Sequence, residues 1–243
     1  MTEFKSYIKN ADCFDEFKNI SKKSIDMVLV DLPYGQTDNK WDSKIDLNDM
    51  WVELKKICKD RCIYVFFTTT KYGNELINSN KKWFRYDLIW QKSKRVGFLN
   101  AKKQPLRSHE MIYVFYKKSG TYNPQKTKGK PYKQSGRRKQ KDDSNYIKKG
   151  RVYYYLPIDN KGDRYPFSII KFQNPIRPIH STQKPTDLCE WLIKTYSNEN
   201  DIILDFTMGS GSTIEACIGT NRNYIGIEKD KDIYLLANDR LDL

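Results

Sequence analysis

Residues 25–35 read IDMVLVDLPYG, and this stretch decides the fold. Five of the six residues at positions 25–30 are apolar, as in a strand buried on both faces of a parallel sheet. The strand ends at Asp31, and Pro33 pushes Leu32 into an extended conformation. The pattern predicts that a carboxylate, the Leu32 carbonyl and the Tyr34 ring meet at the carboxyl edge of a sheet, where open α/β folds bind ligands.

A second ligand-binding pattern lies near the end of the chain. Residues 202–206 predict a strand, a loop containing Gly209 and Gly211 follows, and residues 213–218 predict a helix. The next strand, residues 223–228, ends in Glu228. This succession is typical of the nucleoside-binding half of a doubly wound sheet, in which glycines let the backbone approach the ligand and the acid accepts from ribose hydroxyls.

The segments between these two patterns alternate between strand and helix. Helical spacing from Leu47 to Cys58 predicts one helix, residues 72–78 a second and residues 188–196 a third. Residues 61–68 and 84–90 predict further strands, and another apolar strand follows His109 and Glu110. The alternation predicts an α/β fold with a mostly parallel twisted sheet and helices on both faces.

The positive charge is concentrated in one segment. Residues 117–177 contain 17 Lys and Arg against 4 Asp, whereas the rest of the chain has 27 basic and 26 acidic residues. The segment is also rich in turn formers and tyrosines, so it is either a solvated loop or an insertion that contacts a polyanion. Its place between two halves of a ligand-binding core favours the insertion.

Composition excludes several other classes of protein. No apolar run approaches the ~20 residues of a membrane span, and the first residues lack the apolar stretch of a signal peptide, so a cytoplasmic protein is expected. The five cysteines contain no CxxC pair, and the chain has two histidines, His109 and His180. We therefore expect neither a disulfide framework nor a metal site.

The residues at the first sheet edge suit an exocyclic amino group on a planar base. Its two N–H bonds can be accepted by Asp31 and the Leu32 carbonyl, while Tyr34 stacks on the ring. DLPY resembles the (D/N/S)PP(Y/F/W) motif of the DNA methyltransferases that methylate adenine N6 or cytosine N4. Leu32 departs from the usual proline, but that position acts through its backbone carbonyl.

The second pattern resembles the same family. DFTMGSGSTIEACIGTNRNYIGIE is similar to its DPFxGSGTTxxAA…GRxxIGIE cofactor motif, with Phe206 and Thr207 as departures. The catalytic loop comes first, the basic segment second and the cofactor loop last, which is the permuted order of the β class. The resemblance implies a Rossmann-like fold that uses S-adenosyl-L-methionine, with a catalytic half at residues 1–116, a target-recognition insertion at 117–177 and a cofactor half at 178–243.

The resemblance also implies roles for individual residues. Trp41 and Asp42 match a pair in the loop that folds over cofactor and substrate, and Asp12 lies in a cofactor-pocket segment or is simply a helix N-cap. The implied catalytic residues are Asp31, Leu32, Pro33 and Tyr34. The implied cofactor residues are Asp12, Cys13, Asp31, Lys184, Asp205, Phe206, Thr207, Gly209, Ser210, Gly211 and Glu228, and the implied DNA contacts are Tyr34, Lys102, Lys103, Arg107, Arg137, Arg138 and Lys139.

Several alternatives stay open on the sequence. We expect a flipped adenine in double-stranded DNA because relatives with Asp first in the motif more often act on adenine, but cytosine N4 is an alternative. An RNA methyltransferase and a silent DNA-binding relative are less favoured, and a dinucleotide oxidoreductase lacks the third glycine of GxGxxG. His109 is disfavoured as a base. The family also allows a homodimer, and a bacterial or phage-infected cell is the expected setting.

Overall fold

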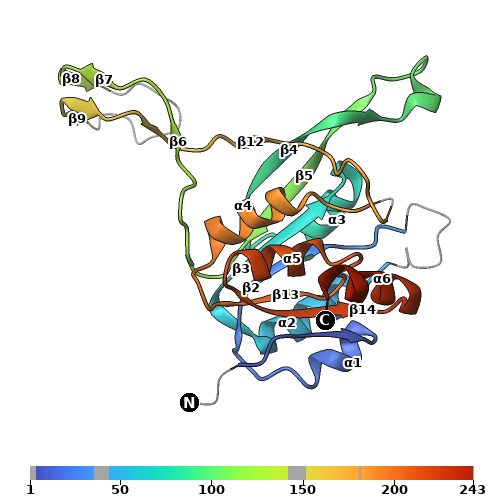
Figure 1. Ribbon diagram of the computed structural model, residues 1–243. Helices are drawn as coiled ribbons and strands as arrows, with labels where there is room; N and C mark the ends of the chain where they lie inside the picture. Colours follow the sequence, from blue (N-terminus) through green and yellow to red (C-terminus); the bar gives the residue numbers. More distant parts are fainter. Residues whose placement is uncertain (1–3, 36–43, 142–151, 181, 243) are drawn as a thin grey trace. The chain divides into compact units, whose positions relative to one another are not determined.

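An eight-stranded sheet forms the centre of the protein. The computed structural model describes residues 4–35, 44–141, 152–180 and 182–242 (Figure 1). The strand order is β1-β14-β13-β2-β3-β5-β4-β12. In that order the strands are Tyr7–Asn10, Asn223–Glu228, Ile202–Asp205, Ile25–Asp31, Cys58–Thr68, Arg107–Phe115, Phe84–Val96 and Ile169–Phe172.

The predicted fold class is confirmed. Among the described strands, β5 runs antiparallel to its neighbours β3 and β4, while the other pairings of the main sheet are parallel. Two buried clusters cover the sheet, one on each face. Val28 and Val30 of β2 belong to one cluster, and Met27 and Leu29 belong to the other. Burial on both faces therefore explains the uninterrupted apolar run that the sequence shows.

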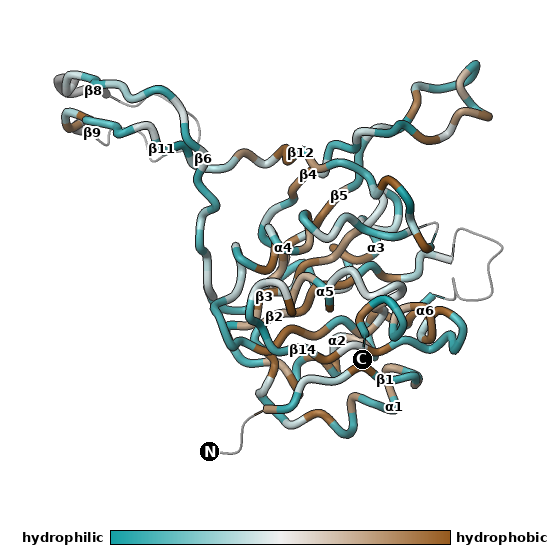
Figure 2. The backbone as a smooth tube through the Cα atoms, in the orientation of Figure 1, coloured by the Kyte–Doolittle hydropathy of each residue, from teal (hydrophilic) through white to brown (hydrophobic). Residues whose placement is uncertain are grey.

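Helices supply the outer part of each cluster. They are Cys13–Phe17 (α1), Leu47–Ile57 (α2), Thr70–Ser79 (α3), Thr186–Tyr196 (α4), Ser212–Gly219 (α5) and Lys231–Leu241 (α6). Side chains of α1, α2 and α3 join the first cluster, and those of α4, α5 and α6 join the second. Figure 2 shows the resulting hydrophobic strands at the centre of this unit. No described helix combines the length and the apolar character that a membrane crossing requires.

Three boundaries differ from the sequence predictions. Helix α2 ends at Ile57, and Cys58 begins strand β3 because it pairs with Ile25 of β2. Strand β4 continues past Trp90 to Val96 because β5 pairs with it as far as Arg107. Helix α6 was not assigned from the sequence. Trp41 and Asp42 lie outside the described residues.

A second compact unit is formed by residues 124–166, and the first by residues 1–123 and 167–243. The second unit contains three ladders, Thr127–Lys128 (β6) with Asp163–Arg164 (β11), Tyr132–Gln134 (β7) with Ile158–Asn160 (β10), and Arg137–Lys141 (β8) with Val152–Tyr155 (β9). The ladders are nested, so they are successive parts of one antiparallel hairpin. The unit lies within the basic segment 117–177, whose last part contributes β12 to the main sheet.

Trp51 is a test of how the first cluster is held together. It is 2% exposed, its ring packs on Tyr64, Phe66 and Phe115, and its Nε1 donates to Ser79 Oγ at 2.8 Å. We expect Trp51→Ala to lower the free energy of unfolding by about 3–5 kcal/mol in urea denaturation, because it leaves a large cavity. The matched control is Val52→Ala, since Val52 is 50% exposed and should change stability little. Equal effects of the two substitutions would contradict this packing.

Candidate active site

Three neighbouring parallel strands each end in an acidic residue. Strand β14 ends at Glu228, β13 at Asp205 and β2 at Asp31, and these strands are adjacent in the sheet. All three acids line one cavity with a volume of about 520 Å³. The cavity therefore occupies the carboxyl edge of the sheet, as the sequence predicted.

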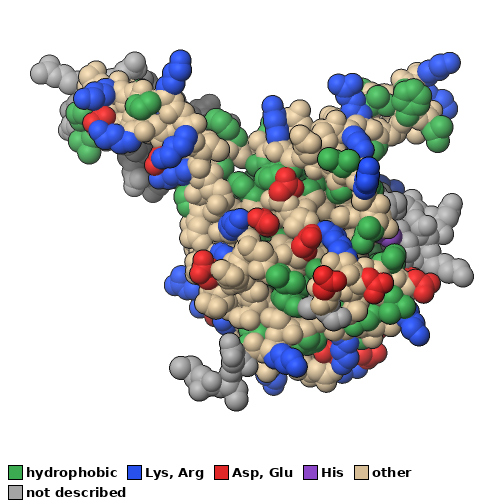
Figure 3. Space-filling model, viewed as in Figure 1, with side chains coloured by type: hydrophobic (Ala, Val, Ile, Leu, Met, Phe, Trp, Pro, Cys, Tyr) green, Lys and Arg blue, Asp and Glu red, His purple; other side chains and the backbone are tan. Residues whose placement is uncertain are grey.

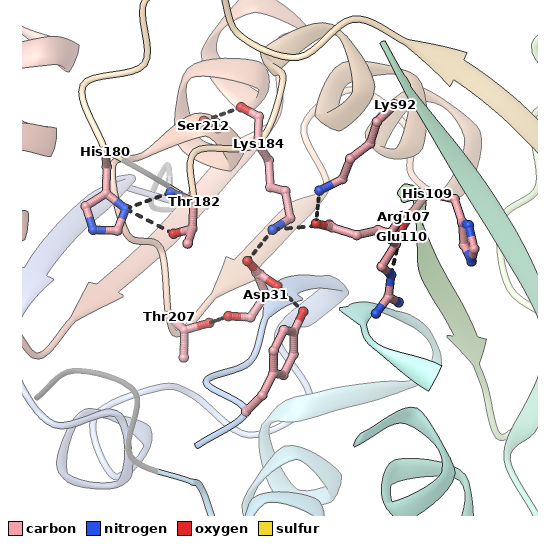
Figure 4. A network of polar contacts seen from close by, with 11 residues as sticks. Asp31, Lys92, Arg107, His109, Glu110, His180, Thr182, Lys184, Thr207 and Ser212 are labelled. Carbon is pink, nitrogen blue, oxygen red and sulfur yellow. Dashed lines mark hydrogen bonds and ion pairs between the residues drawn. The ribbon is translucent and has the colours of Figure 1, made fainter. Parts of the chain in front are cut away.

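Asp31 is held at three points (Figure 4). Tyr34 donates its hydroxyl to Asp31 Oδ1 at 2.5 Å, and Lys184 donates its ammonium to Oδ2. The backbone carbonyl of Asp31 accepts from Thr207 Oγ1 at 3.0 Å. The Asp31 carboxylate thus has one fixed orientation. The bond from Thr207 also joins the loop after β2 to the glycine loop, which contains Gly209 and Gly211.

Lys184 is part of a chain of alternating charges. Its Nζ lies 3.5 Å from Glu110 Oε2, and Lys92 pairs with the other oxygen of Glu110. Burial alone would lower the pKa of Lys184, but Asp31 and Glu110 outweigh it and raise that pKa above its usual value. Burial would likewise raise the pKa of Glu110, but Lys184 and Lys92 lower it. Lys184 and Glu110 therefore stay charged at neutral pH, although their side chains are 12% and 19% exposed.

The ring of Tyr34 lies beside the carboxylate that it bonds. Its centroid is 5.2 Å from that of Tyr72, with 48° between the ring planes. Burial, together with the nearby Asp31 carboxylate, raises the pKa of Tyr34 well above its usual value, so the hydroxyl stays protonated and donates. Leu32 is 2% exposed and packs in the first cluster, so its apolar side chain is accommodated by the core. Both residues and Pro33 line the cavity.

The glycine loop faces the opposite part of the cavity. Gly209 has φ of +52°, and a Cβ added there would meet nothing within 4 Å, so its backbone is open to a ligand. Its N–H donates to Glu228 Oε2 at 2.9 Å, and the Asp230 N–H donates to Oε1 at the same distance. Gly211 lies outside the cavity lining: a Cβ there would come within 3.0 Å of Leu241 of α6, so its role is close helix packing.

Two acids in this part of the cavity, Asp205 and Glu228, have raised pKa values. Burial raises the pKa of Asp205 to about 7, against the effect of hydrogen bonds from Thr213 and the Thr207 N–H. Burial also raises the pKa of Glu228, although backbone donors oppose the shift. Phe206, Thr207 and Ser210 line the cavity beside them, and their role in cofactor binding stays a prediction.

Asp12 lines the cavity and also caps a helix. Its side chain accepts from the Phe14 N–H at 2.9 Å at the start of α1, and it pairs with Lys229 at 3.0 Å. Cys13 lines the cavity next to it. The N-cap expectation for Asp12 is therefore confirmed, and its role in cofactor binding stays a prediction.

The comparison with protein families agrees with this geometry. Residues 25–239 match the sequence model of the N6/N4 methyltransferase family, described as DNA methylase. The chain belongs to this family. S-adenosyl-L-methionine is accordingly the methyl donor of this DNA methylase.

Similar proteins match over most of their length. The type II methyltransferase M1.MboII of Moraxella bovis is 29% identical, over 95% of this chain and 94% of its own. M.HpaI of Haemophilus parainfluenzae is 26% identical over 93% and 70%. Among solved structures, M1.HpyAVI matches with a TM-score of 0.65 at 21% identity over 97% and 98%. The cytosine-N4-specific PvuII DNA methyltransferase matches with 0.69 at 12% over 98% and 87%, so these structures show the fold.

The residues of the methylase cavity fit a nucleoside with an attached charged chain. The volume lies within the usual range for small-molecule sites. Gly209 offers an open backbone, and Glu228 is held by two N–H donors with lone pairs remaining for ribose hydroxyls. The role of Lys184 in cofactor binding stays a prediction, because its ammonium lies on Asp31 while the residue also lines the cavity.

Of the predicted DNA-contacting residues, Tyr34 lines the cavity, whereas Lys102, Lys103 and Arg107 are not part of its lining. Lys102 and Lys103 are exposed in the connection between β4 and β5. Arg107 begins β5 and donates Nε to the His109 carbonyl at 3.1 Å, and the ring of His109 points away from Asp31 (Figure 4). Arg137, Arg138 and Lys139 belong to strand β8, but their side chains are outside the described part of the structure.

Sequence reasoning missed Lys92 and Glu110. Both belong to segments that resemble the family, W-x-K and HE, but neither was given a role. The available signal was a lone acid at the start of an apolar strand, next to a lysine on the preceding strand. Within the described residues, no group of three or more His, Cys, Asp and Glu side chains could hold a metal, and all five cysteines are free and buried.

Lys184 is expected to act as a positioning residue for Asp31. Replacing it in Lys184→Met removes the donor to Oδ2 and leaves Glu110 with one cation. We expect kcat to fall by roughly 10- to 100-fold with little change in the KM for DNA, and stability to fall as well. Steady-state kinetics and urea denaturation measure the two effects.

A second variant separates positioning from stability. In Lys184→Met with Glu110→Gln, the network is neutral again because Asp31 and Lys92 remain with one charge each, so stability should partly recover while kcat stays low. Lys81→Met is the surface control, because Lys81 is exposed and is not part of the network. Recovery of kcat together with stability would show that Lys184 is merely structural.

Asp205 should make folding stability depend on pH. Its pKa is about 7 in the folded protein and lower in the unfolded chain, so from about pH 4 to 7 the folded state alone keeps the proton. Stability from this group therefore decreases as pH rises through that window. We expect Asp205→Asn to lack this decrease and to gain about 2–4 kcal/mol relative to wild type between pH 5 and 8.

Urea denaturation at the two pH values measures this difference. Asp15→Asn is the control, because the hydrogen bond from Lys18 lowers the pKa of Asp15 below its usual value, so Asp15 stays ionised at both pH values and its replacement should leave the decrease unchanged. A wild-type pH dependence that Asp205→Asn leaves unchanged would contradict the assignment.

Proposed function

We propose that this DNA methylase transfers the methyl group of S-adenosyl-L-methionine to N6 of an adenine flipped out of double-stranded DNA. The observation that carries the proposal is that two groups of residues line the same cavity. One is Asp31 with Tyr34 beside it, and the other is Gly209 with Glu228. A base that enters at Asp31 would lie next to a cofactor that is held by Glu228. A base inside a duplex cannot reach this cavity, so the target must leave the helix.

Asp31 activates the amino group by accepting its hydrogen bonds. The lone pair of an aromatic amine is delocalised into the ring and attacks poorly. Acceptors at both amino hydrogens, Asp31 and the Leu32 carbonyl, favour the tetrahedral geometry that localises the lone pair. Lys184 keeps Asp31 oriented during this change, since it bonds the oxygen that Tyr34 does not.

The remaining residues arrange the two reactants. When bound, the cofactor supplies an electrophilic methyl group. Thr207 ties the backbone of Asp31 to the glycine loop, so the amino group and the methyl group are held at a set separation. Tyr34 presents its ring to the flipped base, and the proton released from the amino group passes to Asp31 or to water.

Adenine is proposed on the motif. Asp at its first position is more frequent among the adenine enzymes that DLPY resembles. The similarity to the cytosine-N4-specific PvuII enzyme concerns the fold at 12% identity, so it favours neither base.

The DNA contacts are proposed from charge. Lys102, Lys103 and Arg107 on one segment, and Arg137, Arg138 and Lys139 on β8, supply cations to phosphates. The relative M1.MboII is named a type II methyltransferase, and we infer a modification enzyme of that kind, acting in the cytoplasm.

Nucleoside mass spectrometry tests the reaction and the base together. Unmethylated bacterial DNA incubated with the protein and S-adenosyl-L-methionine should yield N6-methyladenine. Asp31→Ala should reduce product at least roughly 100-fold while DNA binding changes little, because the variant loses an interaction made in the transition state.

The outcomes separate the alternatives. N4-methylcytosine would keep the mechanism and correct the base. Methylated product from RNA but not from DNA would show that RNA is the substrate. Full activity of Asp31→Ala would overturn the role of the carboxylate.

A further inference from the structure

Strands β4 and β5 continue beyond the sheet as a two-stranded ribbon, residues 91–107, which we call the ribbon arm (Figure 1). Val96 still pairs with Arg107 near its far end. Gly97, with φ of +88°, turns the chain into the 3-10 turn Phe98–Asn100. The arm belongs to the same compact unit as the catalytic cavity.

The strand register places the arm on the catalytic edge of the sheet. Asp31 is level with Phe67 of β3, Phe67 with Ile112 of β5, and Ile112 with Leu88 of β4. Strand β4 runs parallel to β2, because one antiparallel strand separates β3 from β4. From position 88 to position 96 the arm therefore extends roughly 25 Å beyond the level of Asp31, at about 3.3 Å per residue.

The tip of the arm is apolar and uncovered. Phe98 is 82% exposed, Leu99 is 100% exposed and Val96 is 47% exposed. Such side chains contribute nothing to the core, and their exposure next to one another marks an interaction surface.

Cations flank the tip on both sides along the chain. Lys94 and Arg95 precede it and Lys102 and Lys103 follow it, and no Asp or Glu occurs from position 88 to position 109. In the described part of the chain, no carboxylate pairs with these four side chains. Figure 3 shows blue and green side chains gathered on this projection. The arm therefore fits a polyanion, whereas the arm of a second copy would bring like charges together.

We propose that the ribbon arm enters the major groove of the substrate DNA and buries Phe98 and Leu99 against base edges, a contact that rests on the proposed function. The major groove, about 12 Å wide, admits a two-stranded ribbon, and its thymine methyl groups accept apolar side chains. The four flanking cations then lie beside phosphates on the groove walls. The arm is a second reading element, separate from the cavity that holds the target base.

Salt dependence separates the apolar tip from the cations. Phe98→Ala with Leu99→Ala should weaken DNA binding roughly tenfold at low and at high salt alike, because it removes apolar burial. Lys102→Gln with Lys103→Gln should instead reduce the slope of log affinity against log salt by roughly two. Ile218→Ala is the matched control, since Ile218 is 46% exposed on α5 and should leave affinity unchanged.

Cross-linking identifies the groove. The five native cysteines are buried, so Leu99→Cys introduces a single exposed thiol among the described residues. By thiol–disulfide exchange it should react with a mixed disulfide tethered to cytosine N4 in the major groove, releasing the small leaving thiol, and not with one tethered to guanine N2 in the minor groove. Ile218→Cys should react with neither.

Failure of this inference can be told from failure of the proposed function. If wild-type protein methylates DNA but the Phe98 and Leu99 double variant binds DNA as tightly, the groove contact is wrong and the function stands. Cross-linking of Leu99→Cys in the minor groove would also overturn the groove contact. So would a Phe98 and Leu99 double variant that loses a wild-type dimer in sedimentation but binds DNA with unchanged affinity. Absence of any methylated nucleoside with wild-type protein would instead remove the function itself.

Discussion

The ion pair between Lys184 and Asp31 is the contact on which the site depends. It joins residues 153 positions apart, one at the end of β2 and one just before α4. A buried carboxylate is costly unless it is paired, and a pair needs its remaining hydrogen bonds to be satisfied. Tyr34 supplies one of these bonds to Asp31, and Glu110 with Lys92 balances the lysine. The negative charge of Asp31 is thus kept inside the protein by a network that is neutral overall. Its members are Asp31, Lys184, Glu110 and Lys92.

The sheet explains how one edge serves two ligands. Adjacent parallel strands deliver Asp31, Asp205 and Glu228 to the same cavity, although β2 lies near the start of the chain and β14 near its end. Their environments differ. Asp31 is bonded to a cation, whereas burial without a paired cation raises the pKa of Asp205 and Glu228. The first suits an acceptor for an amino group, and the latter two suit acceptors for neutral hydroxyls.

The sequence could predict single strands, helices and loops, but it could not predict contacts that depend on how distant strands pair. The strand before Asp31 could be predicted because burial on both faces selects consecutive apolar residues. The loop before α5 could be predicted because close approach of the backbone selects glycine. Lys92, Glu110 and Lys184 come from three segments, and only the pairing of β4 with β5 and the return of the chain to α4 bring them together. The length of β4 was underestimated because its polar outer part, beyond Trp90, has no buried face and therefore no period to read.

Charge balance also constrains how the site can work. The sulfonium of the methyl donor is positive, and after transfer the positive charge belongs to the methylated base until a proton leaves. In the proposed reaction Asp31 would lie where this charge appears, so its attraction to the cation would persist throughout the transfer. Lys184 opposes that attraction before the ligands arrive, because it neutralises Asp31 in the free protein. In that reaction the ion pair would limit how tightly the carboxylate holds the cationic product, while Lys184 and Tyr34 keep Asp31 in one orientation.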